Sequence, residues 1–292
     1  MKELKIWIEP KWTTFDVQNN IFTYLLKKKY NLNFDKHNPD FVIGEYHIGK
    51  TICFHGEPSY GKGSCTHALV PYYDIPDEKQ IRFPLYLYYL YDFIRDGTID
   101  SFHYFFRKRN NENILSTKKN FCNFICGGPL NGNGQFRDEF FEKLNKYKKI
   151  DCPGSRYNNM ERLIGGSYNQ LEASRIKRKF IKDGGYKFTL SFENTSTRDG
   201  YNGYTSEKLL DAMVTNTLPI YWGNILINKE FNNRAFINYH DFQSDEEVID
   251  KIIEIDKNDE LYIKYMCEPL SYKNDYLNED FLIDILDKII KS

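Results

Sequence analysis

The chain contains no long hydrophobic run and no excess of one charge sign. Its 292 residues include 40 basic and 41 acidic side chains, which gives a formal net charge of −1. This balance excludes an overall attraction to nucleic acid or to an anionic membrane. No run approaches the roughly 18 apolar residues that a membrane-spanning helix needs, and the first residues, MKELKIWIEP, place charges where a signal peptide has its apolar region. We therefore expect a cytoplasmic protein without a transmembrane segment.

Cysteine and metal-binding patterns are also sparse. The six cysteines form no CxxC pair and no cysteine–histidine cluster with the spacing of a zinc site. Isolated cysteines of this kind are typical of a reduced, cytosolic protein. No Asp-x-Asp motif follows a predicted strand, so we expect no metal. The cysteines expected as free thiols are Cys53, Cys65, Cys122, Cys126, Cys152 and Cys267.

Short apolar strands alternate with amphipathic helices along the chain. Residues 4–9 predict a first strand, and a second strand–helix series begins at residue 121, after the polar stretch 107–120. This alternation predicts an α/β protein with two Rossmann-like domains facing a cleft. We expect the domains to comprise residues 1–117 and 118–292, and the final helices are free to pack back toward the first domain.

One short motif is misleading. Residues 44–51, GEYHIGKT, fit the phosphate-loop pattern GxxxxGK[ST]. A phosphate loop must open into a helix whose N-terminus faces the phosphates. Here Thr51 begins an apolar, strand-like run, and Gly56 and Pro58 follow it. We therefore do not expect an ATPase of the phosphate-loop class.

The most informative stretch is residues 186–224, YKFTLSFENTSTRDGYNGYTSEKLLDAMVTNTLPIYWGN, called the signature stretch below. Phe188, Leu190 and Phe192 alternate with polar residues, as in a strand with one better-buried face. A polar, glycine-containing loop follows. Thr205 or Ser206 is then placed to cap a helix with one apolar face, and a second buried strand ends the stretch.

Two cations lie where helix dipoles disfavour them. Lys208 is in the first turn of the helix in the signature stretch, and Arg137 is in the first turn of a helix predicted to start near residue 134. An anion bound at these helix starts would reverse the sign of the effect. Two such positions in one domain favour a phosphate site, although a lysine exposed to solvent on a helix explains Lys208 equally well. The basic helix at 170–182 is expected to face water mainly, with a weak membrane-surface role left open.

The run FENTSTRDGYNGYTSEKLLDAMVTNTLPIYWGN closely resembles the donor-binding signature of the α-1,3/1,4-fucosyltransferases, glycosyltransferase family 10. Further resemblances are the segments GQFRDEFF at residues 134–141, DFVIG at 40–44 and FHGEP at 54–58. The resemblance implies a GT-B architecture, with the acceptor bound mainly by the first domain and the nucleotide-sugar by the second. It also implies an inverting transfer of L-fucose from GDP-fucose to a hydroxyl, usually of N-acetylglucosamine, in α-1,3 or α-1,4 linkage.

The family pattern assigns roles to individual residues. Glu57 matches the candidate catalytic base, and His55 is the fallback. The remaining candidates would hold the donor without a metal, since cationic side chains stabilise the leaving diphosphate. They are Arg137, Lys208 and Tyr204 at the diphosphate, Glu207 at the ribose, Asn194 as a brace of the loop, and Arg156 as a looser match.

The sequence also departs from the family. Its first domain is short, which leaves the acceptor open, and Ser206 stands where threonine is usual, a change of little effect if the hydroxyl caps the helix. Two alternatives stay open: a GT-B transferase that uses another nucleotide-sugar, and a non-catalytic glycan-binding relative. The expected partners are a nucleotide-sugar and a glycan, and the sequence does not predict the oligomeric state.

Overall fold

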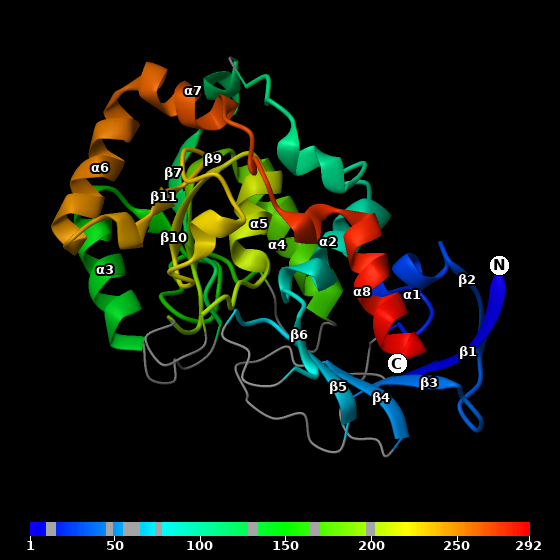
Figure 1. The fold of residues 1–292 in the computed structure, drawn as a ribbon. Helices are drawn as coiled ribbons and strands as arrows, with labels where there is room; N and C mark the ends of the chain where they lie inside the picture. Colours follow the sequence, from blue (N-terminus) through cyan, green and yellow to red (C-terminus); the bar gives the residue numbers. More distant parts are fainter. Residues whose placement is uncertain are drawn as a thin grey trace. The chain divides into compact units, whose positions relative to one another are not determined.

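The computed structural model describes residues 1–9, 16–44, 49–54, 65–73, 78–111, 113–127, 134–163, 170–196 and 202–292. The chain forms two compact units, each built on its own sheet (Figure 1). Unit 1 comprises Met1–Tyr104, Gly200–Tyr204 and Asn274–Ser292, and unit 2 comprises Phe105–Asp199 and Thr205–Lys273. Contacts therefore assign the last helix and part of the signature stretch to the unit that holds the N-terminus.

Unit 1 contains a six-stranded, fully parallel sheet in the order β2-β1-β3-β4-β5-β6. Its strands are β1 (Lys2–Ile8), β2 (Tyr30–Phe34), β3 (Phe41–Gly44), β4 (Gly49–Phe54), β5 (Cys65–Val70) and β6 (Gln80–Arg82). Because β4 begins at Gly49, the lysine and threonine of the phosphate-loop pattern lie in a strand and open no helix. The rejection of a phosphate loop is confirmed.

An aromatic cluster packs two helices of unit 1 against its sheet. The helices of unit 1 are α1 (Ile21–Leu26), α2 (Tyr86–Arg95), α8 (Glu279–Lys291) and the short 3-10 helix η6 (Asp275–Leu277). Asn20 caps α1 in a reciprocal arrangement with Thr23. The Phe22 ring lies 5.6 Å from that of Phe54, and the Tyr88 ring of α2 lies 4.4 Å from Phe54. These rings join α1 and α2 to the sheet.

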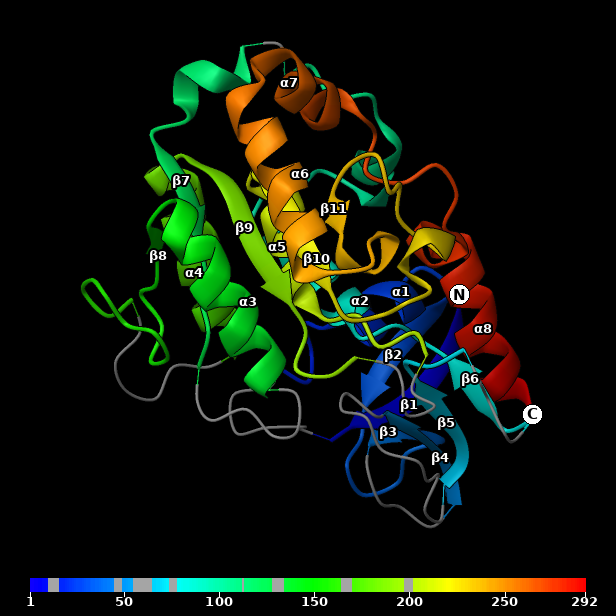
Figure 2. The ribbon, with the colours of Figure 1, turned by 90° about the vertical axis from the view of Figure 1, so that its left-hand side faces the viewer.

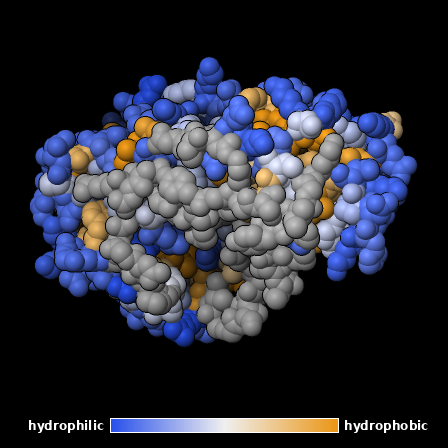
Figure 3. All heavy atoms as spheres, turned by 60° about the horizontal axis from the view of Figure 1, so that its bottom comes forward, coloured by the Kyte–Doolittle hydropathy of each residue, from blue (hydrophilic) through white to orange (hydrophobic). Residues whose placement is uncertain are grey.

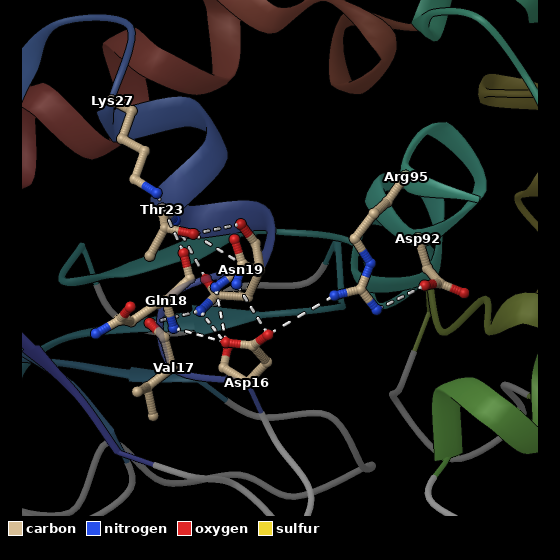
Figure 4. A network of polar contacts seen from close by, with 9 residues as sticks. Asp16, Val17, Gln18, Asn19, Thr23, Lys27, Asp92 and Arg95 are labelled. Atoms are coloured by element: carbon tan, nitrogen blue, oxygen red, sulfur yellow. Dashed lines mark hydrogen bonds and ion pairs between the residues drawn. The ribbon is translucent and has the colours of Figure 1, made fainter. Parts of the chain in front are cut away.

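A polar network fastens the segment before α1 to α2 (Figure 4). The carboxylate of Asp16 accepts hydrogen bonds from the backbone amides of Gln18 and Asn19, both at 3.0 Å. Arg95 lies 3.1 Å from Asp92 and 3.8 Å from Asp16, so its guanidinium bridges the two carboxylates. These hydrogen bonds and the nearby Arg95 lower the pKa of Asp16, although its partial burial alone would raise it.

The expectation of six free thiols is wrong for one pair. Cys53 of β4 and Cys65 of β5, twelve residues apart in sequence, form a disulfide between adjacent strands. Nothing in their sequence spacing indicated this pairing, because the two cysteines approach each other only once β4 and β5 lie side by side. The other four cysteines are free.

Unit 2 contains a five-stranded, fully parallel sheet in the order β11-β10-β9-β7-β8. Its strands are β7 (Asn120–Asn123), β8 (Ile150–Asp151), β9 (Tyr186–Phe192), β10 (Leu218–Trp222) and β11 (Ile237–Asn238). Helices α3 (Gly134–Tyr147) and α6 (Asp245–Lys257) cover one face, while α4 (Gln170–Gly184) and α5 (Glu207–Val214) cover the other (Figure 2). The remaining helices in this part are α7 (Asp259–Cys267), η2 (Ile114–Thr117), η4 (Ile227–Lys229) and η5 (Tyr239–Asp241), and η1 (Phe102–Phe106) crosses the boundary between the units.

Both sheets follow the same plan. Numbered within its unit, the first sheet runs 2-1-3-4-5-6 and the second runs 2-1-3-4-5, so in both the direction of chain winding reverses between the first and third strands. In unit 2 this switch point lies between β7 and β9, and ligands of open α/β sheets bind at the carboxyl ends of strands beside such a point. The predicted fold class, an α/β chain with two Rossmann-like units, is confirmed.

The part of the surface seen in Figure 3 is mainly hydrophilic. On the face shown in Figure 3, hydrophilic residues cover most of the surface that the structure describes, and apolar residues form small separate areas. No helix within the described ranges is long and apolar enough to cross a bilayer.

Candidate functional site

Three cations gather at the switch point of unit 2. Cys126 lies just beyond β7, and Arg137, Arg156 and Lys208 all act electrostatically on its thiol. Burial raises the pKa of Cys126, and the three cations oppose that rise. Since these residues come from three separate segments, only the fold brings them together. This concentration of positive charge is suited to an anionic ligand.

Arg137 is almost fully buried in the first turn of α3. Its Nη1 lies 3.5 Å from Oδ1 of Asn194, the residue two positions beyond β9. Its Nε has no hydrogen-bond partner among the residues that the structure describes. Burial lowers the pKa of Arg137, while Cys126 and Glu193 oppose this shift, and the guanidinium stays charged. A buried, charged N–H group without a partner is a candidate donor to a bound anion.

A buried carboxylate organises the start of α5. Glu193 is 0% exposed, and its Oε1 accepts a hydrogen bond of 2.7 Å from the backbone amide of Ser206. Its Oε2 accepts from the Ser206 hydroxyl at 2.6 Å and from Nζ of Lys208 at 3.3 Å. The lysine is therefore the counter-ion of a buried glutamate, which accounts for a cation at a helix start. It is still 26% exposed, so its ammonium can also reach a ligand.

The expected cap of this helix is absent. Ser206 occupies the N-cap position of α5, but its side chain makes no capping hydrogen bond and donates to Glu193 instead. The sequence-based expectation of a capping hydroxyl at this position is wrong. Glu193 is not among the site residues that the sequence predicts, although its position directly after a buried strand is a signal for it.

Gly223 makes room for this carboxylate. A Cβ at this position would lie 2.5 Å from Cγ of Glu193, a separation that forces one of the two segments to move. The glycine after β10 is therefore required by close approach to Glu193. This contact links the two ends of the signature stretch, and the backbone amide of Glu193 also donates to the carbonyl of Trp222 at 2.8 Å.

Glu207 is held as a carboxylate. Its side chain lies 3.7 Å from Nζ of Lys177 on α4. Burial alone would raise the pKa of Glu207, but Lys208 and Lys177 outweigh it and lower the pKa to about 2. Glu207 is thus a hydrogen-bond acceptor at any physiological pH.

A second buried ion pair joins α4 and α5. Arg178 lies 3.4 Å from the carboxylate of Asp211 and donates to the Ser174 hydroxyl at 2.7 Å. Burial raises the pKa of Asp211 to about 7, although the neighbouring Arg178 opposes the rise. The prediction that the charges of this basic helix mainly face water is wrong for Arg178, which is 4% exposed. Its helical position gave no signal, because the apolar face of α4 is interrupted there.

Arg156 is held by a neighbour in the same site. Its guanidinium makes two hydrogen bonds with the carboxylate of Asp138 on α3, and this partner raises the pKa of Arg156. Its backbone amide donates to the carbonyl of Cys126 at 3.2 Å. A Cβ at Gly154 would lie 2.2 Å from the same carbonyl oxygen. Glycine is therefore needed for the segment of Arg156 to approach the end of β7.

The structure gathers most of the predicted site, but not all of it. Arg137, Arg156, Asn194, Glu207 and Lys208 lie in unit 2. Tyr204 is buried, and its contacts assign it to unit 1. The predicted base Glu57 and its fallback His55 lie outside the described residues. Within the ranges that the structure covers, no group of three histidine, cysteine or acidic residues is arranged to hold a metal ion.

Comparisons with known proteins identify the family of this chain. The chain is 27% identical over 315 aligned residues to the alpha-(1,3)-fucosyltransferase FucT of Helicobacter pylori, covering 94% of this chain and 59% of that protein. It is 29% identical over 158 residues to glycoprotein 3-alpha-L-fucosyltransferase A of Drosophila melanogaster, covering 53% of this chain and 28% of that one. The chain therefore spans about three-fifths of the first relative and less than a third of the second.

The fold has a close match among solved structures. The crystal structure of an alpha1,3-fucosyltransferase with GDP-fucose superposes with a TM-score of 0.76 at 22% identity, covering 100% of this chain and 91% of the other. The family model for the C-terminal part of glycosyltransferase family 10 (fucosyltransferase) matches residues 116–281. That match takes in more than half of the chain and every cation of the site in unit 2. The chain belongs to glycosyltransferase family 10, the fucosyltransferases.

Proposed function

We propose that this chain is an inverting fucosyltransferase that moves L-fucose from GDP-fucose to a hydroxyl of an N-acetylglucosamine-containing glycan, in α-1,3 or α-1,4 linkage. The observation that carries the proposal is the gathering of Arg137, Arg156 and Lys208 at the switch point of unit 2. Rossmann-like sheets bind the phosphates of nucleotides at such a point. The relatives are named as fucosyltransferases, and we infer from these names that the transferred sugar is fucose.

The reaction needs a base that takes the proton of the attacking hydroxyl. It also needs cations that stabilise the negative charge on the leaving diphosphate. The oxygen of the acceptor hydroxyl attacks C1 of fucose, the bond from C1 to the β-phosphate oxygen breaks, and GDP leaves with the electron pair. Glu57 takes the proton of the hydroxyl. The charge that grows on the diphosphate is stabilised by Arg137 and Lys208, which are already fixed by Asn194 and Glu193 respectively.

The remaining residues bind the rest of the donor. Glu207 accepts hydrogen bonds from the ribose hydroxyls, since its low pKa keeps it ionised. Tyr204 donates to the diphosphate, and Arg156 adds positive charge from its pair with Asp138. We propose that this set of cations does the work that a divalent metal does in other transferases, so no metal is required. We also propose a cytoplasmic location, which fractionation of the source cells would check.

A melting comparison with GDP, UDP, CMP and ATP tests the donor. A ligand that binds only the folded state, at about 100 times its dissociation constant, adds about 2.7 kcal/mol of stability. This should raise the melting midpoint by roughly 5–10 °C for a protein of this size. We expect the shift with GDP, little shift with the other three, and the same GDP shift in excess EDTA. Transfer assays with GDP-fucose and lactosamine-type acceptors then test the reaction.

The alternatives give different results. A preference for UDP would replace this proposal with another nucleotide-sugar transferase. Glycan binding without transfer, by folded protein, would identify a non-catalytic relative. A GDP shift that disappears in EDTA would overturn the metal-independent part alone.

A further inference from the structure

Part of the signature stretch is bound by the strand ends of unit 1. Asn202–Tyr204 belong to unit 1 by their contacts, although Phe105–Asp199 and Thr205–Lys273 on either side belong to unit 2. The backbone amide of Tyr73, three residues beyond β5, donates to the carbonyl of Asn202 at 2.6 Å. Nη2 of Arg82, the last residue of β6, donates to the carbonyl of Gly203 at 3.3 Å. The carboxyl ends of these parallel strands, where open sheets usually bind ligands, hold a segment of the chain itself.

Arg82 is fixed on both sides by aromatic rings. Its guanidinium carbon lies 3.9 Å from the centre of the Tyr73 ring and 4.6 Å from that of Tyr276 in η6. The residue is only 4% exposed. A planar guanidinium stacks on rings and donates to a carbonyl at the same time, whereas a lysine ammonium offers only a point charge. The direction of the hydrogen bond to Gly203 is therefore set by the packing of Arg82.

Gly203 allows this close approach. Its φ of +114° is one that residues with a side chain rarely adopt. A Cβ at this position would also lie 2.9 Å from the carbonyl oxygen of Pro71 and 2.9 Å from the Tyr73 ring. The hydrogen bond from Arg82 and the missing side chain of Gly203 therefore both hold the same short backbone segment in place.

We propose that Arg82 is a positioning residue of the donor site. By holding the carbonyl of Gly203, it fixes the backbone of the next residue, Tyr204, and through it the start of α5. Lys208 follows only five residues after Gly203, and small displacements of charged groups at a diphosphate reduce binding strongly. In this role Arg82 acts through the backbone of residues 203–204 and not by binding the donor itself. This inference rests on the proposed function, because it assigns Arg82 to the binding of the GDP-sugar.

Two variants test the contact from its two sides. Arg82→Lys keeps the charge and removes the planar stack, and Gly203→Ala keeps Arg82 and displaces the segment. Each should raise the KM for GDP-fucose and the dissociation constant for GDP by ~5–20-fold, with an unchanged KM for the glycan acceptor. Arg95→Lys is the matched control, since Arg95 is also in unit 1 and pairs with Asp92 and Asp16. It should leave the donor KM within twofold.

The outcomes separate this inference from the proposed function. If the wild-type chain neither binds GDP nor transfers fucose, the proposed function fails whatever Arg82 does. If the wild-type chain does both and Arg82→Lys keeps its donor KM, the positioning role is overturned. Equal losses in donor and acceptor KM, in step with a lower melting midpoint in both variants, would show that Arg82 only stabilises the fold and would also overturn it.

Discussion

The carboxylate of Glu193 accepts two hydrogen bonds from Ser206, one from its backbone amide at 2.7 Å and one from its hydroxyl at 2.6 Å. With Lys208 as the third partner, the glutamate is satisfied although it is fully buried. The start of α5 is therefore fixed before any ligand binds. Such preorganisation is what a site needs to stabilise charge that appears only during a reaction.

Removing the charge of Lys208 alone should therefore destabilise the protein more than removing the charges of Lys208 and Glu193 together. Lys208→Ala leaves Glu193 buried without its cation and should lower the free energy of unfolding by roughly 2 kcal/mol. Adding Glu193→Gln to that variant removes the unpaired charge and should restore at least half of the loss. Urea unfolding of the two variants and the wild type measures both steps. A double variant less stable than Lys208→Ala would show that Glu193 needs no cation.

Arg137→Ala should weaken GDP binding by about 1.5–3 kcal/mol, the range for hydrogen bonds to charged groups. Calorimetric titration with GDP measures this. Lys143→Ala is the control on the same helix, because Lys143 pairs with Asp245 and Glu246 on α6 and is 40% exposed. Unchanged GDP affinity in Arg137→Ala and in Lys208→Ala would place the phosphate site elsewhere.

Glu57→Gln tests proton removal separately from donor binding. The amide keeps the size of the side chain and cannot take a proton, so turnover should fall by ~10²–10⁴-fold. The GDP-induced melting shift should stay the same as that of the wild type. Near-normal transfer by folded Glu57→Gln protein would transfer the role of base to another residue, with His55→Ala as the next variant to assay.

The raised pKa of Asp211 predicts an unusual pH dependence of the free energy of unfolding. Its pKa is raised to about 7 in the folded state from an ordinary value of 3.8, so the folded protein binds its proton more tightly than the unfolded chain does. Stability from this group is fully present below pH 4 and is lost as the pH rises toward 7. Between pH 5.5 and 7 Glu207, with its pKa of about 2, is ionised in both states and adds no slope.

The measurement is the difference in unfolding free energy between the wild type and Asp211→Asn across that range. We expect the wild type to lose stability relative to the variant as the pH rises from 5.5 to 7. Arg178 and Lys177 are the cations that face Asp211. A constant difference would mean that Arg178 keeps Asp211 ionised at all these pH values.

Gly223→Ala should lower both the melting midpoint and the affinity for GDP. The new Cβ would lie 2.5 Å from Cγ of Glu193, so the glutamate must shift away from Ser206 and Lys208. The loss should approach the 1–3 kcal/mol of an overpacked core. Gly97→Ala serves as a control for substitution itself, since a Cβ there meets nothing within 4 Å, although its φ of +75° adds some strain. Equal GDP affinity in the two variants would refute the packing argument.

The sequence predicted the longer elements well. The alternation at Phe188, Leu190 and Phe192 predicts β9, and the apolar face that follows Ser206 predicts α5, because both apolar periods are regular. The strand β2, YNLNF, was missed. It lies at the edge of its sheet and carries two asparagines, so it lacks the apolar run that marks a buried strand.

The site was predicted in composition and not in its internal pairing. Arg137 and Lys208 were found because each contradicts the helix dipole, a local signal. The clamp of Glu193 on Ser206 and Lys208, the buried pair of Arg178 and Asp211, and the bond between Cys53 and Cys65 depend on contacts between segments. Periodicity and spacing in the sequence do not predict such contacts, because the contacts form only when the elements pack together.

The disulfide links β4 to β5 directly, whatever the length of the chain that joins the two strands. Cys53 lies near the end of β4 and Cys65 is the first residue of β5, so their bond joins the two sides of the connection that contains Glu57. Doubling the length of such a connection costs only about 0.6 kcal/mol in closure entropy, and the strand register need not change with it. A longer connection between Cys53 and Cys65 would therefore cost this chain little stability, while β4 and β5 stay paired.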